Sequence, residues 1–563
     1  MKARSFLLAV VLAVVLLLGA AAGLWWSMVQ QSPLRLAEQP LELPRAARFV
    51  PRQSTLSLHW LVDPGRLPAY AQAVAPTRQR RSAREGMEQL RDGAFALAGL
   101  DYTSELADWL GPQVSLALLE PAGAEGAMGW VLALASRDDD GARRFLQRFW
   151  QTRSLAGTDL QISRYRGIGV ISGRGALLGR DPQPLATALI DDDLLLLASG
   201  RGVLEQALDG SQLDELHQLG DQELSRQLRQ LGHGVALLTA SPAAMETWLG
   251  FPAALSQRKD LEGLVAALVP ERADLQLEGR LRFRSPVIRR FGAAELSAPL
   301  LRASGGPADA LALLEKPAQL LKSDVSDPLD QWLGPILRSR LERIGSPALE
   351  VIAELDEGPL LWEHLSDGWL LASRDGRPDD QAVDGQLKQK GLVRSNLPGE
   401  SASLNVWTQL QRQRSHGKEA LEAQLAVALE SESGVAWWSN ALEALHQRRD
   451  QKALEPRLDQ LEALAADGAS LQQLALAEQG ARDQLQQWRP WTLLQAVAGR
   501  SLLPAVHGMA MAVSAGEAVS AGEAVSAGEA VSAGEAVSAD IPAASDQAEA
   551  SDTLRFRARL SFA

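Results

Sequence analysis

Four short sequence patterns occur twice along the chain in the same order, and this constrains the fold more than any other feature. They are a strand-like apolar run, Trp-Leu-Gly-Pro, Leu-Leu-Ala-Ser, and a closing run of alternating polar and apolar residues. The copies lie at residues 55–60 and 310–314, 109–112 and 332–335, 196–199 and 370–373, and 274–283 and 553–562. A repeated order of this kind indicates an internal duplication.

The first copy alternates between strand patterns and helix patterns. Residues 114–119 and 129–134 are apolar runs separated by a turn-rich stretch, which predicts a β-hairpin. Residues 142–152 then carry aromatic side chains at helical spacing. Antiparallel strands interleaved with helices are typical of an α+β fold in which the helices pack on one face of the sheet. We therefore predict two related α+β units, at residues 49–298 and 299–563.

The second unit contains a stretch whose apolar residues follow a helical period. Four leucines recur at this spacing between polar residues, and Pro456 fits the first turn of a helix. The leucines are Leu454, Leu458, Leu461 and Leu464. We expect residues 408–500 to form a helical insertion on the sheet of the second unit.

A low-complexity segment follows at residues 512–552. The hexamer Ala-Val-Ser-Ala-Gly-Glu occurs four times over residues 512–535. A six-residue period is found in β-solenoids, but a few copies without large side chains cannot bury a core. We interpret the segment as a hairpin loop enlarged by repeat slippage, because the entropic cost of closing a loop grows only slowly with its length.

The N-terminus carries an apolar segment of membrane-spanning length. Lys2 and Arg4 precede an uncharged run at residues 6–26. At about 1.5 Å rise per residue this run spans roughly 30 Å as a helix, which is the thickness of a bilayer core. Positive charge before the run favours a cytoplasmic N-terminus. We predict a single-pass membrane protein whose membrane contact is made through residues 6–26 and whose body is extracytoplasmic, in the periplasm or thylakoid lumen.

The alternative is a cleaved secretory signal. Ala20, Ala21 and Ala22 offer a small-residue cleavage site, whereas Trp25 and Trp26 would suit the interface end of a retained anchor. In the anchored form, residues 1–29 are the tail and transmembrane helix. Residues 30–48 then form a proline-containing spacer, because proline opposes helix formation. Both interpretations place the body beyond a membrane.

Charge and cysteine content exclude several classes of function. The chain of 563 residues has a net charge of −13 and contains no cysteine. Nucleic-acid binding depends on basic patches that meet the phosphate backbone, so we expect no nucleic-acid partner. The lack of cysteine excludes disulfide bonds, thiolate metal sites and thiol nucleophiles.

No motif in the sequence assigns a catalytic, cofactor-binding or metal-binding residue. None of the seven histidines is spaced from another as in a metal site, and His-Glu-x-x-His, a phosphate-binding loop and Gly-x-Ser-x-Gly are all absent. His59, beside Trp60, is expected to face a domain interface. The aspartates at 138–140 and 191–193 are expected to cap a helix and to form a turn, with a hard cation as the alternative.

Tryptophan is unusually frequent for the number of tyrosines, with 15 against three. Trp437, Trp438, Trp488 and Trp491 cluster in the predicted helical insertion. They would either fill the core between short helices, which we favour, or form an exposed aromatic face that docks a partner or a bilayer surface.

Three segments resemble a known family. They are Phe49-Val50-Pro51, residues 109–111 and residues 156–160. With these, the first unit is similar to uncharacterised membrane-anchored proteins of cyanobacteria that are grouped as a domain of unknown function. The resemblance implies a cyanobacterial envelope or thylakoid protein, and it implies no activity and no site residues.

The sequence supports three hypotheses about function. The first is a non-enzymatic, membrane-tethered binding or scaffold protein that acts with a protein partner. The second is a carrier or sensor of an apolar, lipid-like ligand held between sheet and helices. The third is a hydrolase with an unrecognised site, which would need an acid–base pair with mutually perturbed pKa values in a cleft.

Overall fold

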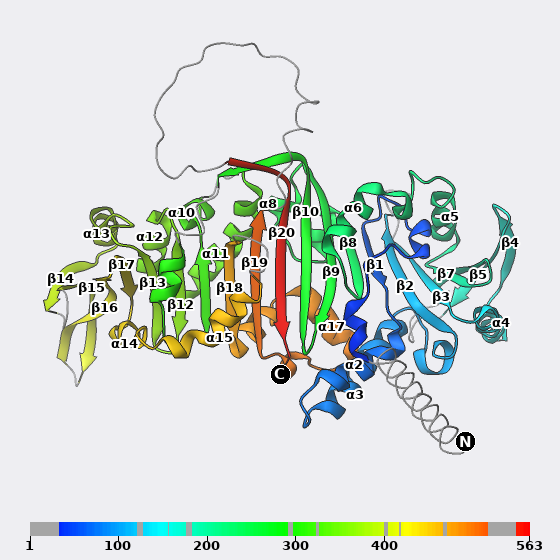
Figure 1. The fold of residues 1–563 in the computed structure, drawn as a ribbon, viewed down its shortest axis with the longest axis horizontal. Coiled ribbons are helices and arrows are strands. Elements are labelled where there is room, and N and C mark those ends of the chain that lie inside the picture. Colours follow the sequence, from blue (N-terminus) through cyan, green and yellow to red (C-terminus); the bar gives the residue numbers. More distant parts are fainter. Residues whose placement is uncertain are drawn as a thin grey trace, which may run out of the picture.

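The computed structural model describes residues 33–562 apart from 121–127, 156, 176–182, 291–296, 323–325, 399–402, 416–417, 465–469 and 516–547. In this part of the chain, 20 strands form one sheet that runs along the whole molecule (Figure 1). Every pair of neighbouring strands is antiparallel.

The first ten strands form the first repeat. They are β1 (Leu56–Trp60), β2 (Leu110–Leu119), β3 (Gly129–Ser136), β4 (Gln161–Tyr165), β5 (Ile168–Gly175), β6 (Gln183–Ile190), β7 (Leu194–Ala198), β8 (Ala236–Ala240), β9 (Leu261–Glu271) and β10 (Asp274–Arg290). Their spatial order is β4-β5-β6-β7-β3-β2-β1-β8-β9-β10.

The remaining ten strands form the second repeat and follow the same plan. They are β11 (Ala310–Leu314), β12 (Leu360–Leu365), β13 (Gly368–Arg374), β14 (Val393–Pro398), β15 (Ser403–Ser415), β16 (Lys418–Glu432), β17 (Val435–Ser439), β18 (Ser470–Ala477), β19 (Gly508–Ala515) and β20 (Ala548–Ser561). Their order, β14-β15-β16-β17-β13-β12-β11-β18-β19-β20, matches the first repeat strand for strand.

Helices cover both faces of the sheet. They are α2 (Leu67–Val74), α3 (Arg80–Ala96), α4 (Asp139–Leu155), α5 (Arg201–Gly210), α6 (Gln222–Leu231), α7 (Pro242–Thr247), α8 (Ala253–Ser256), α9 (Ala298–Ala303), α10 (Pro317–Leu320), α11 (Pro328–Ile344), α12 (Pro347–Leu355), α13 (Asp380–Gln389), α14 (Leu442–Gln447), α15 (Gln451–Glu462), α16 (Glu478–Gln486) and α17 (Arg489–Ala498). Short helical turns include η1 (Pro33–Glu38), η2 (Arg45–Phe49), η3 (Pro64–Arg66), η4 (Tyr102–Leu106), η5 (Gln218–Gly220) and η7 (Leu503–Ala505).

The two faces are named here by their side chains. Face A carries Leu58 and Trp362, and it is covered by α2, α3, α4, α7 and α8 together with η1 and η4 in the first repeat, and by α11, α12, α13, α16 and α17 in the second. Face B carries His59 and Glu363, and it is covered by η2, α5 and α6 and by α9, α14 and α15. Because helices lie on both faces, β7 is an apolar run with all five residues buried.

N-terminal caps fix where several of these helices begin. The Asp221 side chain accepts hydrogen bonds from the backbone amides of Glu223 and Leu224, where α6 begins. Ser241 and Ser346 cap α7 and α12 in the same way. An oxygen at this position satisfies amides that have no partner within the helix, so each helix starts at a defined residue.

The predicted arrangement of two separate units is wrong, because the repeats share one sheet. Residues 274–282 of β10 pair with residues 553–561 of β20, and these strands lie side by side at the centre of Figure 1. Each closing strand would otherwise present an unpaired edge, and pairing the two edges satisfies both sets of backbone groups. The expectation that helices pack on only one face is also wrong.

The predicted helical insertion at residues 408–500 is wrong as well. This stretch contains most of β15, all of β16, β17 and β18, and four helices. Trp437 and Trp438 lie on β17, where their buried side chains point to opposite faces of the sheet. The leucines at helical spacing belong to α15 and the turn after it. The helix prediction was extended from them to neighbouring residues in which apolar and polar side chains alternate, as they do in strands.

The fold predicted from the sequence began with a transmembrane helix, and the structure does not support that element. Within the described residues, no helix combines the length and the apolar character that crossing a bilayer would require. The predicted segment at residues 6–26 lies outside the described residues, as do residues 516–547 of the low-complexity segment.

Candidate functional site

A buried polar cluster surrounds His59 on face B of the first repeat. The His59 Nδ1 lies 2.8 Å from the Ser115 hydroxyl, and its Nε2 lies 2.8 Å from the Gln218 side-chain oxygen. The Gln218 amide nitrogen lies 3.1 Å from the Ser57 hydroxyl. Burial lowers the pKa of His59 to about 4, so its imidazole is neutral at pH 7.

This cluster is sealed inside the sheet and cannot meet a substrate. His59, Ser115 and Gln218 are all buried, with Gln218 contributed by η5. The strand pairings match His59 to Leu313 and Ser115 to Leu361 in the second repeat. Because leucine serves at the matching positions, the fold itself does not depend on the polar cluster. His59 lies within the core of one repeat, away from any domain interface.

A second buried cluster lies on face B of the second repeat. Burial raises the pKa of Glu363 to about 8, and the positive charge of Arg448 opposes that shift. Arg448 bridges to Glu430 at 2.8 Å and to Glu432 at 2.7 Å, and its guanidinium lies 5.0 Å from the centre of the Trp437 ring. Glu363 is almost completely buried, so it too has no contact with solvent.

Both aspartate triplets bind arginines. Asp138 accepts a hydrogen bond from the Asp140 amide and pairs with Arg144 at 2.7 Å, next to the start of α4. Asp193 pairs with Arg45 at 2.7 Å, and Asp192 pairs with Arg143 at 2.8 Å. Among the described residues, no group of three or more His, Cys, Asp and Glu side chains could hold a metal ion.

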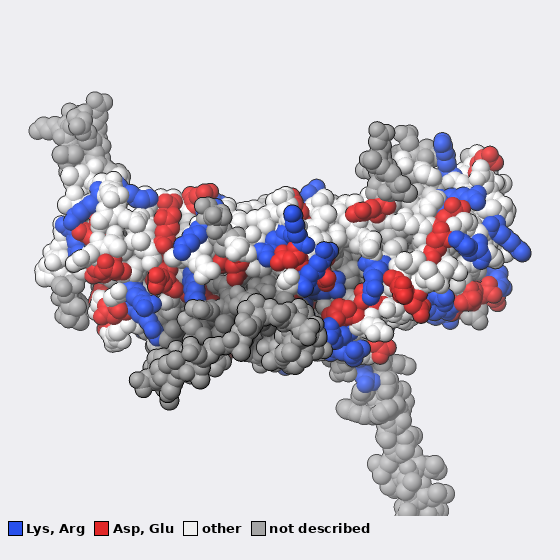
Figure 2. All heavy atoms as spheres, turned by 90° about the horizontal axis from the view of Figure 1, so that it is seen from above, with Lys and Arg blue, Asp and Glu red and all other residues white. Residues whose placement is uncertain are grey.

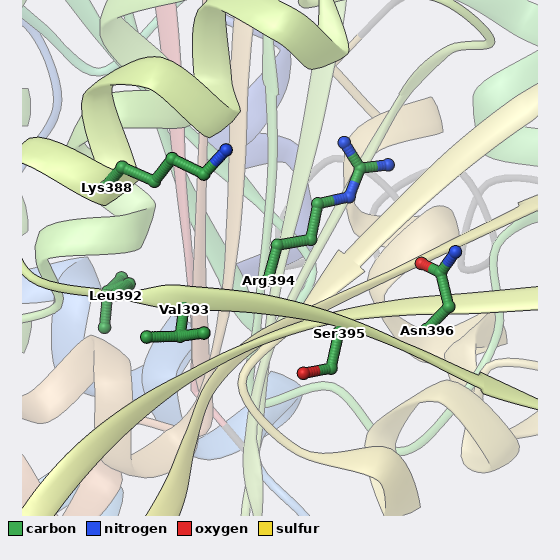
Figure 3. A pocket seen from close by; sticks show the side chains of 6 residues that line it. All are labelled: Lys388, Leu392, Val393, Arg394, Ser395 and Asn396. Atoms are coloured by element: carbon green, nitrogen blue, oxygen red, sulfur yellow. The ribbon is translucent and has the colours of Figure 1, made fainter.

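The accessible site is a pocket at one end of the sheet. It has a volume of about 490 Å³ and lies between the end of α13 and β14. Lys388 comes from α13 and Arg394 from β14, and Figure 3 shows the two side chains reaching toward the same space. The other lining residues are Leu392, Val393, Ser395 and Asn396.

Asp384 and Trp407 position the two cations of this pocket. The Asp384 carboxylate lies 2.5 Å from the Lys388 ammonium and accepts a 3.0 Å hydrogen bond from the indole nitrogen of Trp407. The hydrogen bond from Lys388 is the main reason that the pKa of Asp384 is lowered. The Arg394 guanidinium lies 5.2 Å from the centre of the buried Trp407 ring. The stacking holds Arg394 beside the pocket.

The strand beside the pocket is the last one of the sheet. β14 pairs with β15 on one side, and no described strand pairs with its other side. Five of its six residues are exposed, including Val393 at 52% and Leu397 at 44%. An open edge presents backbone donors and acceptors that another strand can pair with. Cations beside such an edge favour an incoming segment that carries carboxylates.

Sequence reasoning assigned none of these residues. The four-tryptophan cluster was the nearest signal, but Trp437, Trp438 and Trp491 are buried in the core and Trp488 is partly exposed. The alternation of residues 403–410 predicts a strand, and a proline at 398 is a common end to an edge strand. Together they could have pointed to β14.

Comparisons with known proteins assign the chain to a family but give it no activity. No curated protein matches the chain. Three crystal forms of TP0453 share limited likeness: form I at 12% identity and TM-score 0.25, covering 45% of this chain and 81% of that one; form IV at 10% and 0.23, covering 42% and 79%; and form III at 8% and 0.23, covering 47% and 87%. A likeness at these TM-scores carries no argument about function. A family model described as "Protein of unknown function (DUF3352)" matches residues 9–523, so the chain belongs to the DUF3352 family.

Proposed function

We propose that this protein is an extracytoplasmic binding or scaffold protein that captures an extended, acidic segment of a protein partner along β14. One observation carries the proposal, namely that the open edge of β14 lies against a pocket lined by Lys388 and Arg394. In strand addition, backbone hydrogen bonds supply affinity and the neighbouring side chains supply specificity.

The opposite end of the sheet provides a contrast. β4 is the other terminal strand, and its exposed Ile162 and Arg164 resemble the exposed residues of β14. The cation that follows β4, Arg166, pairs with Asp209 at 3.0 Å, just as Lys388 beside β14 pairs with Asp384 at 2.5 Å. The two edges therefore differ in the pocket that lies beside β14, and we expect the acidic partner there.

The placement outside the cytoplasm rests on the N-terminal sequence. Lys2 and Arg4 before the apolar run at residues 6–26 support export of the body. Figure 2 shows acidic and basic side chains interspersed along the face seen from above, as suits a body exposed to an aqueous compartment. Protease added to intact cells after removal of the outer envelope should degrade the body, and full protection until lysis would contradict this placement.

Binding can be measured with defined peptides. The probe is a fluorescein-labelled peptide of alternating Glu and Thr, about eight residues long to match a strand. Fluorescence anisotropy with the full chain should show saturable binding, and a matched Lys-Thr peptide should bind much more weakly. Lys388→Glu with Arg394→Glu should weaken binding of the acidic probe about tenfold.

The matched control is Arg164→Glu on β4, which should leave the affinity for the acidic probe unchanged. Binding that is equal for the acidic and basic peptides, or that falls equally for the control, would contradict the proposal. Infrared amide I spectra should gain strand signal on binding, because the probe must become extended when it joins the sheet.

A further inference from the structure

The two repeats differ in the helices that connect their first and second strands. β11 and β12 are joined by α10, α11 and α12, whereas β1 and β2 are joined by η3, α2, α3 and η4. α3 and α11 correspond, because each has 17 residues and each packs on the other repeat, α3 against α17 and α11 against α8. After α11 the chain forms the nine-residue α12, but after α3 it forms only the five-residue turn η4.

The missing helix has a measurable consequence on face A. The strand pairings assign five face A positions of the first repeat to counterparts in the second. For example, Leu58 pairs with Leu116 as Ala312 pairs with Trp362 on the equivalent strands. In the second repeat these positions are buried, with exposed fractions between 0% and 10%: Ala310 6%, Ala312 6%, Leu360 1%, Trp362 9% and Trp369 2%. Their counterparts in the first repeat are only half-buried, and they form what we call the open patch: Leu56, Leu58, Val114, Leu116 and Trp130.

α12 shows what fits over this part of the sheet. It presents an apolar stripe that is buried in the same core as Trp362 and Trp369. The buried residues of the stripe are Ala348, Leu349, Val351, Ile352 and Ala353. Because the strand plan is the same in the two repeats, the first repeat offers an equivalent floor, over which the shorter η4 places Tyr102 and Leu106 in place of a nine-residue helix.

The side chains of the open patch also define the shape of an occupant. Leu56 and Leu58 replace the smaller Ala310 and Ala312 on the first strand, so an occupant needs small residues there. Leu116 replaces the larger Trp362 on the second strand, so an occupant has room for large apolar residues there. A helix with alanine on one flank and leucine or isoleucine on the other meets both requirements.

We propose that the open patch receives a short amphipathic helix from a protein partner, seated on the first repeat as α12 is seated on the second. The proposal concerns a different surface from β14 and does not depend on strand addition there. A helix is favoured over an acyl chain or a second copy of this chain because the equivalent floor holds a helix within the same molecule.

The first experiment uses α12 itself as the probe. A peptide with the sequence of residues 346–355, closed into a helix by a lactam bridge and labelled with fluorescein, is titrated with the full chain. Saturable binding is expected, and Leu116→Glu should weaken it at least about tenfold, because a carboxylate would be buried against the apolar stripe. A bridged peptide of the same composition in scrambled order should not bind.

Ile162→Glu is the control. Ile162 is an exposed apolar residue on the edge strand β4 of the same repeat, and it is not part of the open patch. This variant should bind the probe as the unmodified chain does. A loss equal to that of Leu116→Glu would overturn the proposal.

A second measurement keeps the test decisive if Leu116→Glu fails to fold. Hydrogen exchange of the unmodified chain should slow in β1 and β2 when the probe is added, and it should not change in β11 and β12. Absence of probe binding, or protection confined to the second repeat, would overturn the proposal. So would a co-purifying lipid that the probe cannot displace, or a dimer that Leu116→Glu dissociates.

Discussion

The backbone amide of Trp369 donates a 2.8 Å hydrogen bond to the side-chain oxygen of Asn440. At the matching place in the first repeat, the amide of Trp130 donates a 2.9 Å hydrogen bond to the Ser199 hydroxyl. In both repeats the acceptor follows the strand that pairs with the tryptophan's strand. One contact between side chain and backbone has thus been kept in two repeats while the side chain that makes it has changed.

We predict that Asn440→Ala frees the Trp369 amide without disrupting the repeat. A hydrogen bond of this kind contributes about 1 kcal/mol, which corresponds to roughly a fivefold change in an opening equilibrium. Amide hydrogen exchange at Trp369 should therefore accelerate about fivefold. Asn440→Ser, which copies the first repeat, should restore most of the protection. Unchanged exchange in the alanine variant would show that the bond has no role.

Burial of His59 predicts a loss of stability in acid. The pKa of His59 is about 4 in the folded protein, against 6.5 for the free side chain, so the unfolded chain takes up the proton first. The stability that neutral His59 contributes to the folded protein is fully present above about pH 6.5. The free energy of unfolding then falls by up to about 3 kcal/mol as the pH drops toward 4. Below about pH 4 it should fall no further.

The second repeat suggests the variant that tests this prediction. His59→Leu with Ser115→Leu copies Leu313 and Leu361 and removes the titrating group. The urea midpoint is measured at pH 7 and at pH 4.5 for both chains. The difference between the two midpoints should be smaller in the variant than in the unmodified chain. An identical difference in both chains would assign the acid sensitivity to other groups.

Glu363 predicts the opposite dependence on pH. Burial raises its pKa to about 8, against 4.5 for the free side chain, so it is protonated in the folded protein at neutral pH. The unfolded chain releases the proton above about pH 4.5, and stability is lost as the pH rises from there toward 8. Glu363→Gln should raise the free energy of unfolding at pH 7 by roughly 2–3 kcal/mol. It should leave stability at pH 4.5 nearly unchanged, and a destabilised variant at pH 7 would mean that Glu363 is ionised.

The sequence predicts part of the fold because strand patterns are local. The runs at residues 55–60 and 310–314 fall on β1 and β11, and the closing runs fall on β10 and β20, which are equivalent strands. The other two patterns are not equivalent. One Trp-Leu-Gly-Pro copy lies at the start of β2 and the other in α11, and the Leu-Leu-Ala-Ser copies lie on β7 and β13. Short apolar strings recur by chance, so they can match without sharing a place in the fold.

The candidate sites could not be predicted, because both depend on long-range order. Whether β14 is an edge strand is decided by pairings between residues far apart in the chain, such as Leu370 with Ser439. The open patch is defined by a helix that one repeat has and the other lacks. In the sequence, its leucines look like ordinary core residues. The alignment of the two repeats is marked by one shared dipeptide, Gly129-Trp130 and Gly368-Trp369, and a dipeptide is too short to recognise.

The joint between the repeats is held by charges as well as by backbone pairing. Glu278 on β10 accepts hydrogen bonds from Arg555 and Arg557 on β20, at 2.9 Å from the Arg555 Nε and 3.3 Å from an Arg557 terminal nitrogen. The three side chains are mostly buried. Removing the carboxylate would take away an acceptor that two largely buried guanidinium groups share.

We predict that Glu278→Ala weakens the joint and leaves each repeat intact. The expected cost is about 3 kcal/mol, because a largely buried charge pair is broken from one side. Hydrogen exchange should accelerate in β10 and β20, while β3 and β13, at the centres of the two repeats, keep their protection. Glu278→Gln should recover part of the loss, since an amide oxygen can still accept from Arg555. If exchange rises equally in all four strands, the two repeats unfold as one unit and the joint is not a separate element of stability.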